Sequence, residues 1–325
     1  MAAADQIMSL IKSFGEGNEE RFFSTSMQIA ASEARMGHTT FAQELKKLIE
    51  KAKKERSLSL VDNSRTIPIS STKRELNELI DVFQPKIKLK DMILNTSTRE
   101  VLERIIDEQN KSELLLKYNL KPQRKLLLTG PPGSGKTMTA QAIAGELNLP
   151  VFIVRLDGLI SKFMGESISK LRIIFDTMES QRAVYLFDEF DSIGSTREQS
   201  LELGEIKRVL NSFLVNIEQD QSNSIIIAAT NLPEVLDKAL FRRFDSIISY
   251  PLPSQSEIMS VIKRNIKGLT IEPNFNIKEI AKSAAGLNFA EIVKACEDAI
   301  KSSILSGKFS IDSAILCQAI ENRKH

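Results

Sequence analysis

Histidine is scarce in this chain: the 325 residues include two histidines, His38 and His325. A zinc site of the HExxH type and a Ser-His-Asp triad both require histidines inside a folded site. The sequence excludes an HExxH site and argues against a triad of that kind. Since no protease chemistry fits the chain, any role in protein degradation requires a separate protein.

Cysteine and long apolar stretches are equally scarce. The chain has two cysteines, Cys296 and Cys317, without CxxC spacing, and we expect free thiols in a reducing cytosol. No window reaches about 18 uncharged apolar residues, and the N-terminal stretch carries Asp5 and no basic segment. We therefore expect a cytoplasmic protein with no membrane insertion.

The charge of the chain is balanced, with 44 Lys and Arg against 42 Asp and Glu and a formal net charge of +2. This balance predicts no long-range attraction to DNA or RNA, so no nucleic-acid partner is expected. Hydrophobic residues make up 42% and charged residues 26% of the chain, as in ordinary globular proteins. Neither a disordered chain nor a membrane-embedded one fits these values.

The spacing of apolar residues predicts a small N-terminal helical domain over 1–55, beginning with the pattern Ile7, Leu10, Ile11 and Phe14. Such a stripe is typical of the core of a helical bundle. Its surface is also a candidate for docking a client or partner protein, and the two interpretations are compatible. Residues 56–90 begin with a stretch rich in Ser and Asn and are predicted to be a linker.

Short apolar runs separated by helical segments follow. They cover 125–129, 151–155, 183–187, 225–230 and 246–250. Continuous apolar runs of this kind are typical of strands buried on both faces of a parallel sheet, so residues 91–253 are predicted to form a large α/β domain. Strand signals stop after Pro251 and Pro253, and residues 254–325 are predicted to form an all-helical domain.

A glycine-rich loop, GPPGSGKT at 130–137, matches the pattern GxxxxGK[ST] between a predicted strand and a predicted helix. Its backbone can fold around a polyphosphate with the N–H groups pointing inward, and a helix N-terminus adds partial positive charge. Lys136 is expected to contact the β- and γ-phosphates, and the Thr137 hydroxyl to ligate Mg²⁺. The other expected nucleotide-binding residues of the loop are Pro132, Gly133, Ser134 and Gly135.

A second motif is the apolar strand that ends in Asp188 and Glu189. In a parallel sheet its carboxyl end lies at the same edge as the glycine-rich loop. We expect Asp188 to hold Mg²⁺ through water and Glu189 to polarise the attacking water. Alone, such a strand end is equally typical of a solvated turn, but together with the loop it predicts nucleotide hydrolysis.

The class of nucleotide hydrolase depends on further residues. DEFD at 188–191 superficially matches the DExD of helicases, but the chain is too short for a second motor domain. Asn231 ends the run IIIAAT, where its amide can orient water. Arg242 and Arg243 precede the last predicted strand and are suited to neutralising charge on a transferring phosphoryl group. The residues alone leave open whether these arginines act within one chain or on a neighbour.

Residues from about 90 to 325 resemble the AAA family of ATPases, in the branch that includes katanin, spastin and the proteasomal ATPases. The resemblance rests on LLLTGPPGSGKT, YLFDEFD, AATN and ALFRRFD, in this order. It implies ATP or ADP as the bound nucleotide, an α/β large domain, a helical lid and a homo-oligomeric ring, usually a hexamer. Arg242 and Arg243 would then reach the nucleotide of the neighbouring subunit.

Two further segments resemble parts of this family. Lys162, Phe163 and Met164, followed by Gly165, look like the pore loop that grips polypeptide in the central channel; a core contact by Phe163 and Met164 is the alternative. The segment 286–292 resembles the lid motif, although Leu287, Asn288 and Phe289 replace the usual small residues and no sensor 2 arginine is present. From the lid we expect only nucleotide contact near Gly286 and Ala290.

These observations predict an ATP-driven ring that pulls a client polypeptide past Phe163, with the N-terminal helices selecting the client. A separate, subtilisin-like protease is a suggested partner. One alternative is an ATP-gated switch or assembly platform that does not thread polypeptide. Another is a DNA-directed motor, against which the near-neutral charge argues.

Overall fold

The computed structural model describes most of the chain. The described residues are 24–27, 29–30, 32, 34, 37–38, 42–49, 79–159, 166–194, 202–236, 238–307 and 310–324. The chain divides into two compact units, Met1–Thr66 and Ile67–His325. In the first unit, residues 42–49 are helical, with Ala42 buried and Leu48 exposed. The expected helix around Ile7 lies outside the described residues.

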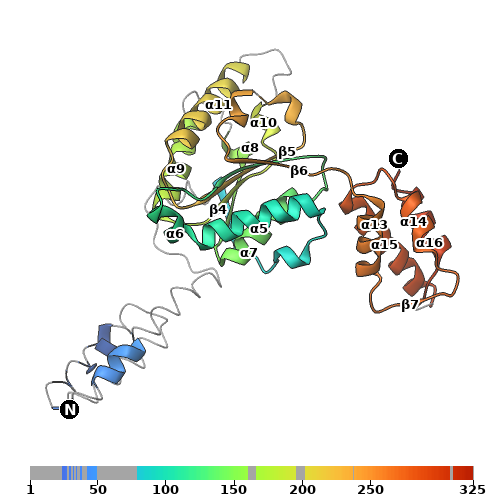
Figure 1. Ribbon diagram of the computed structural model, residues 1–325, viewed down its shortest axis with the longest axis horizontal. Coiled ribbons are helices and arrows are strands. Elements are labelled where there is room, and N and C mark those ends of the chain that lie inside the picture. Colours follow the sequence, from blue (N-terminus) through green and yellow to red (C-terminus); the bar gives the residue numbers. More distant parts are fainter. Residues whose placement is uncertain are drawn as a thin grey trace. The chain divides into compact units, whose positions relative to one another are not determined.

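The second unit is built on a six-stranded sheet with the strand order β1-β3-β4-β5-β2-β6. Strands β4, β5 and β6 of this sheet are labelled in Figure 1. The strands are β1 (Ile80–Phe83), β2 (Lys125–Thr129), β3 (Val151–Val154), β4 (Val184–Phe187), β5 (Ile225–Thr230) and β6 (Ser246–Ser249). All pairs are parallel except β1 with β3. Every residue of β4 and β5 is buried, which explains their continuous apolar sequences. The predicted α/β class with a parallel sheet is confirmed.

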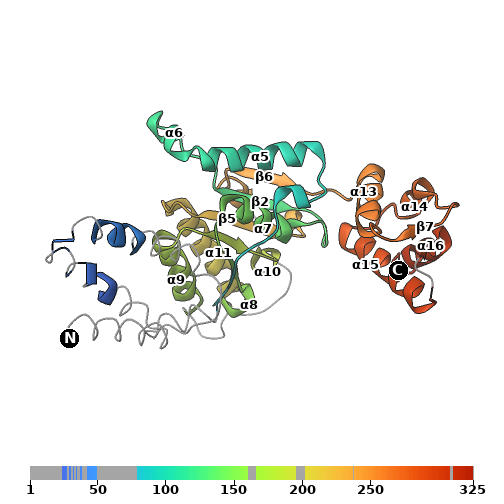
Figure 2. The ribbon, with the colours of Figure 1, turned by 90° about the horizontal axis from the view of Figure 1, so that it is seen from below.

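Helices cover both faces of the sheet (Figure 2). On one face, α5 (Thr96–Asn110) and α7 (Lys136–Leu147) pack through Leu102, Ile105 and Ile143 on the strands. On the other face lie α9 (Glu166–Ser180) and α11 (Glu202–Gln219). Short helices complete this part: η1 (Leu89–Asp91), α6 (Ser112–Lys117), α8 (Leu156–Leu159), α10 (Asp191–Gly194), η2 (Pro233–Val235) and α12 (Lys238–Phe241). The sheet is thus covered on both sides, as a doubly wound fold requires.

The stretch 56–90 is not a linker throughout. Ile80–Phe83 forms strand β1, which pairs antiparallel with β3 in the register Ile80↔Val154, and η1 follows at Leu89–Asp91. Strand β1 contains Asp81 and buries one of its four residues, so it lacks the continuous apolar run of the predicted strands, and its pairing is set by a partner some 70 positions away in the sequence. The linker prediction was wrong for these residues.

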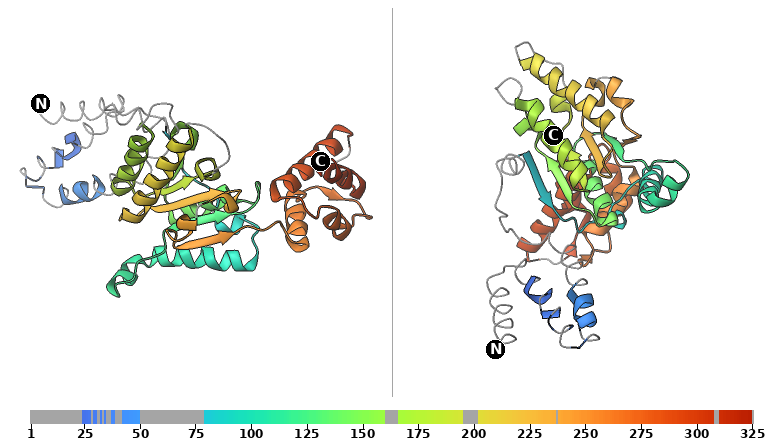
Figure 3. Two further views of the ribbon diagram at one scale, coloured as in Figure 1. Left: turned by 90° about the horizontal axis from the view of Figure 1, so that it is seen from above. Right: turned by 90° about the vertical axis from the view of Figure 1, so that its left-hand side faces the viewer.

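The C-terminal part is mainly helical (Figure 3). Its helices are α13 (Gln255–Asn265), α14 (Ile277–Ser283), α15 (Phe289–Leu305) and α16 (Ser313–Glu321). They enclose a core of their own that includes Ile262, Ile280, Ile292 and Leu316. Contrary to the all-helical prediction, β7 (Thr270–Ile271) and β8 (Ser310–Ile311) form a small parallel sheet. Two-residue strands leave no periodic signal in a sequence.

None of the helices in the described ranges has the length and apolar character that crossing a bilayer would require.

Candidate nucleotide site

Three neighbouring strands deliver the candidate residues to one edge of the sheet. Strand β5 lies between β4 and β2, and all three run parallel. Gly130 follows β2, Asp188 follows β4 and Asn231 follows β5. The carboxyl ends of parallel strands are the usual position of ligand sites in open α/β sheets. The glycine-rich loop, Asp188 and Asn231 therefore lie at the same edge of the sheet, as the sequence predicted.

The glycine-rich loop passes close to its surroundings at two positions. Gly130 has φ +148°, and a Cβ atom there would lie 2.3 Å from the carbonyl oxygen of Tyr250. Gly133 has φ +69°, and a Cβ atom there would lie 2.7 Å from Oδ1 of Asn288. Larger residues would therefore clash with the backbone of Tyr250 or with Asn288, the N-cap of α15. Gly135 ends the loop as the N-cap of α7, so the N-terminus of this helix faces the loop.

Lys136 is 6% exposed although it carries an ammonium group. Its Nζ donates to the carbonyl oxygens of Gly130 at 2.8 Å and Pro131 at 2.9 Å, and to Oδ1 of Asn231 at 2.8 Å. Burial lowers the pKa of Lys136, and the carboxylate of Asp188 opposes that shift. The ammonium is thus held at the loop by oxygen acceptors, which phosphate oxygens can replace.

Thr137 and Asp188 are in direct contact. The Thr137 hydroxyl donates to Oδ2 of Asp188 at 2.6 Å, and the backbone N–H of Glu189 donates to Oδ1 of Asp188 at 3.0 Å. Hydroxyl and carboxylate oxygens are the ligand types that Mg²⁺ prefers. The structure therefore brings the two expected metal-site residues together.

Glu189 is exposed and has φ +50°, in the left-handed region that is uncommon for residues other than glycine. Such backbone outliers concentrate at functional sites, where the surrounding structure holds them. Here the bond to Asp188 and the bond from Phe190 N–H to the carbonyl oxygen of Ala229 hold the turn against β5. The side chain of Glu189 lines the cavity described below.

Asp191 holds Asn231 in place, a relationship that the sequence analysis did not predict. Its Oδ1 accepts hydrogen bonds from the backbone N–H of Asn231 and from the hydroxyl of Thr230, both at 3.0 Å. Because Asn231 also accepts from Lys136, the ends of β5 and α7 are connected. Asp191 is the fourth residue of the DEFD segment at 188–191, and this position in the motif was the signal in the sequence that could have indicated the role.

A cavity of about 600 Å³ lies over these groups, within the size range of small-molecule sites. Its walls come from the loop, the acid pair, Asn231 and the first turns of α15. They are Pro132, Gly133, Ser134, Gly135, Lys136, Thr137, Met138, Asp188, Glu189, Asn231, Phe289, Ala290, Val293, Lys294 and Glu297. The backbone N–H of Ala290 donates to the carbonyl oxygen of Gly133 at 3.2 Å. Gly286 is not among the lining residues.

The two arginines lie outside this cavity. They stand between α12 and β6, and Nε of Arg243 donates to Oε2 of Glu218 at 3.0 Å. Arg242 is exposed. Neither side chain lines the cavity of its own chain. Lys162, Phe163 and Met164 lie outside the described residues, between α8 and α9.

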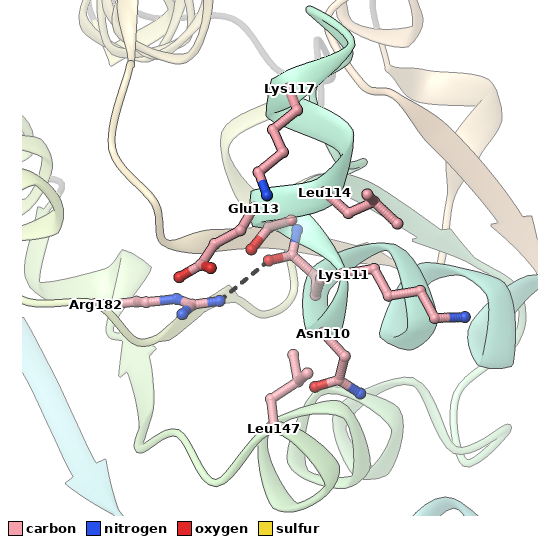
Figure 4. Close-up of a pocket in the computed structure, with 9 residues that line it drawn as sticks. Asn110, Lys111, Glu113, Leu114, Lys117, Leu147 and Arg182 are labelled. Carbon is pink, nitrogen blue, oxygen red and sulfur yellow. Dashed lines mark hydrogen bonds between the residues drawn. The ribbon is translucent and has the colours of Figure 1, made fainter.

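A second hollow, of about 450 Å³, differs in its chemistry (Figure 4). It is lined by the ends of α5 and α7, by α6 and by Arg182, which precedes β4 and so lies at the amino ends of the strands. Nη2 of Arg182 donates to Oε1 of Gln109 at 3.4 Å. The residues that line this hollow include neither a glycine-rich loop nor an acid pair, so it does not repeat the features of the candidate nucleotide site.

No group of three or more His, Cys, Asp or Glu side chains suited to a metal ion occurs in the part of the chain that the structure describes. The hydroxyl of Thr137 and the carboxylate of Asp188 nevertheless fit Mg²⁺, because this ion is commonly held by one or two protein oxygens together with substrate phosphates.

A strand, a glycine-rich loop and a helix that begins with Lys136 and Thr137, facing the acid pair Asp188 and Glu189 at the end of β4, define a P-loop nucleoside triphosphatase. Residues 126–252 match the model of the ATPase family associated with various cellular activities (AAA). An uncharacterized AAA family ATPase of Sinorhizobium fredii is 31% identical over 322 residues, which cover 99% of this chain and 96% of the relative. The chain belongs to the AAA family, and it is an ATPase.

Two other relatives match over shorter stretches. An ATP-dependent zinc metalloprotease, FtsH of Helicobacter pylori, is 32% identical over 240 residues, which cover 71% of this chain and 38% of the relative. A proteasome-activating nucleotidase of Methanoregula boonei is 33% identical over 235 residues, which cover 70% of this chain and 54% of the relative. The chain therefore corresponds to about half or less of the length of these two proteins.

Proposed function

We propose that Mg-ATP binds in the cavity of about 600 Å³ and is hydrolysed there. The backbone of Gly133, Ser134 and Gly135 holds the phosphates, Lys136 contacts the β- and γ-phosphates, and Pro132 and Ala290 complete the walls. Thr137 and Asp188 hold Mg²⁺, which supplies positive charge to the phosphate oxygens. The observation that carries this assignment is the contact of Thr137 with Asp188 beside that of Lys136 with Asn231.

Glu189 acts as the base in this proposal. Its side chain lines the cavity and is exposed to solvent, so it can accept a proton from water beside the γ-phosphate. Asn231, held by Asp191, orients that water. The lining position of Gly133 and Ala290 supports lid contact with the nucleotide, whereas Gly286 has only its proximity in sequence to support such a contact.

The arginines complete the site of a neighbouring copy in a homo-oligomeric ring, proposed to be a hexamer. This assignment is supported by their position outside the cavity of their own chain and by the exposure of Arg242. Arg243 is anchored by Glu218, so Arg242 is the better placed of the two to reach a second subunit. A guanidinium delivered in this way neutralises charge that develops on the transferred phosphoryl group.

The work that hydrolysis drives is remodelling of a client polypeptide. Two relatives carry names that connect the shared ATPase region with protein degradation, a metalloprotease and a proteasome-activating nucleotidase. Lys162, Phe163 and Met164 are the proposed gripping loop, because large apolar side chains can bury client side chains without sequence preference. Any proteolysis belongs to a separate partner, for which a subtilisin-like enzyme remains the suggestion.

The Glu189→Gln variant tests the proposal. It should retain ATP and hydrolyse it about 10²- to 10⁴-fold more slowly, because the base is removed while the phosphate contacts remain. A pull-down with this variant and ATP should hold the client on the ring. The matched control is Glu234→Gln, a change at an exposed glutamate of η2. Undiminished ATP turnover by Glu189→Gln would show that Glu189 is not the base.

A further inference from the structure

Tyr250 is a buried residue at the junction between the sheet and the helical lid. It is 4% exposed, directly follows β6, and precedes the connection 251–254 that leads to α13. Its backbone N–H donates to the carbonyl oxygen of Thr129 at 2.7 Å, so it continues the pairing of β6 with β2. Its own carbonyl oxygen lies against Gly130, where a Cβ atom would approach it to 2.3 Å. The backbone of Tyr250 thus supports the first residue of the phosphate loop.

The side chain of Tyr250 reaches the other end of that loop. Its hydroxyl lies 2.7 Å from Oγ1 of Thr139, a fully buried residue, and the Thr139 hydroxyl donates to the carbonyl oxygen of Gly135 at 3.0 Å. A threonine hydroxyl has one proton. Since this proton is directed to Gly135, the hydroxyl of Tyr250 must be the donor to Thr139. Burial raises the pKa of Tyr250, so the donor stays protonated at neutral pH.

The acceptor at the end of this chain of hydrogen bonds is the N-cap of α7. Gly135 has φ +99°, and its carbonyl oxygen also accepts the backbone N–H of Thr139 at 2.9 Å. A trans peptide unit is planar, so fixing this carbonyl also fixes the N–H of Lys136 on the opposite side. That N–H belongs to the helix N-terminus at which phosphate binds.

We propose that Tyr250 is a positioning residue which, through Thr139, holds the peptide between Gly135 and Lys136 in its phosphate-binding orientation. The inference rests on the proposed nucleotide site. It assigns a task in nucleotide binding to two residues that lie 111 positions apart and are not among those that line the cavity. It also places the start of the lid connection in contact with both ends of the phosphate loop.

The test compares variants that differ by one hydroxyl. Tyr250→Phe and Thr139→Val each break the chain of hydrogen bonds, whereas Thr139→Ser keeps it. The control is Tyr185→Phe, because Tyr185 is also a buried tyrosine but donates to the carbonyl oxygen of Gln181, away from the loop. For each variant, the Kd of fluorescently labelled ADP and ATP with Mg²⁺ is measured together with the Tm of the nucleotide-free protein.

Tyr250→Phe and Thr139→Val should raise the Kd for both nucleotides about three- to tenfold, the effect expected for one lost hydrogen bond. Thr139→Ser and Tyr185→Phe should keep the wild-type Kd. The variant that combines Tyr250→Phe with Thr139→Val should bind nucleotide no more weakly than Thr139→Val alone, because both substitutions break the same chain of hydrogen bonds. If Tyr250→Phe and Thr139→Val lower the Tm but leave the Kd unchanged, the hydroxyls serve only packing and the proposal is wrong. Should Tyr250→Phe or Thr139→Val fail to fold, the Kd of the other variant, compared with that of the two controls, decides whether the proposal holds.

Failure of the underlying site is recognised separately. Lys136→Ala removes the central phosphate contact and should abolish measurable nucleotide binding. Unchanged affinity in Lys136→Ala would overturn the proposed nucleotide site, whatever Tyr250→Phe shows.

Discussion

The hydroxyl of Thr137 donates to Oδ2 of Asp188 at 2.6 Å, although the two residues are 51 positions apart in the sequence. This bond connects the first turn of α7 with the carboxyl end of β4. It places a hydroxyl and a carboxylate, two ligand types suited to Mg²⁺, beside the phosphate loop.

Asp188→Asn should weaken Mg²⁺-dependent activity. The amide keeps the shape of the side chain but removes its negative charge, so the affinity for Mg²⁺ should fall about 10- to 100-fold, as for residues that support a metal through its bound water. The measurement is ATPase rate against Mg²⁺ concentration. Asp176→Asn, at an exposed position of α9, should leave the curve unchanged. Identical curves for the wild type and Asp188→Asn would contradict the assignment.

The two cysteines should react at very different rates. Cys296 is fully buried, and burial raises the pKa of its thiol to about 12, whereas Cys317 is partly exposed. At pH 8 iodoacetamide should therefore modify Cys317 first, as followed by mass spectrometry, and urea should abolish the difference. Faster modification of Cys296 in the folded protein would contradict the structure.

The raised pKa of Cys296 also has a consequence for stability at alkaline pH. Above about pH 9 the unfolded thiol ionises while the folded one remains protonated, so the unfolded state binds fewer protons. The stabilising contribution of the neutral Cys296 should therefore be lost as the pH rises through 9 toward 12. Denaturant unfolding at pH 8 and 10 should show a smaller pH-dependent loss of stability in Cys296→Ala than in the wild type.

Phe163→Ala distinguishes threading from an ATP-gated switch. If Phe163 grips the client, the variant should keep its ATPase activity within about twofold but lose unfolding of a client, because one large apolar contact is removed from every subunit. The measurements are phosphate release and loss of fluorescence from a folded reporter fused to the client. Retained unfolding in Phe163→Ala would show that Phe163 does not grip the client, whereas a wild-type protein that hydrolyses ATP but unfolds no client would favour the alternative of an assembly platform.

The local motifs of the site could be predicted from the sequence, because each is a contiguous pattern that follows a strongly apolar strand. The loop before Lys136 and the acids after β4 are of this kind, and the parallel sheet brings them together. Contacts between distant residues could not be predicted in this way. The bond between Thr139 and Tyr250 leaves no periodic signal, and neither does the support of Asn231 by Asp191.

Among the elements of the fold, the central strands were predictable because burial on both faces gives continuous apolar runs. The edge strand β1 and the paired strands β7 and β8 were not predictable. Strand β1 contains Asp81 and buries one of its four residues, two-residue strands are too short for a pattern, and the partners lie far away in the sequence. The structure thus extends the large domain into the stretch that the sequence assigned to a linker.

Mixing two inactive variants tests the central claim, that side chains of two copies complete one ATP site, most directly. Glu189→Gln removes the base but keeps Arg242, and Arg242→Ala keeps the base but removes the guanidinium offered to the neighbour. Each alone should hydrolyse ATP at least about 100-fold more slowly than the wild type. Rings mixed at equal amounts should recover a substantial part of the activity, because some sites then pair an intact Glu189 with an intact Arg242. Wild-type turnover by Arg242→Ala alone, or by a protein that stays monomeric with ATP and Mg²⁺, would contradict the account.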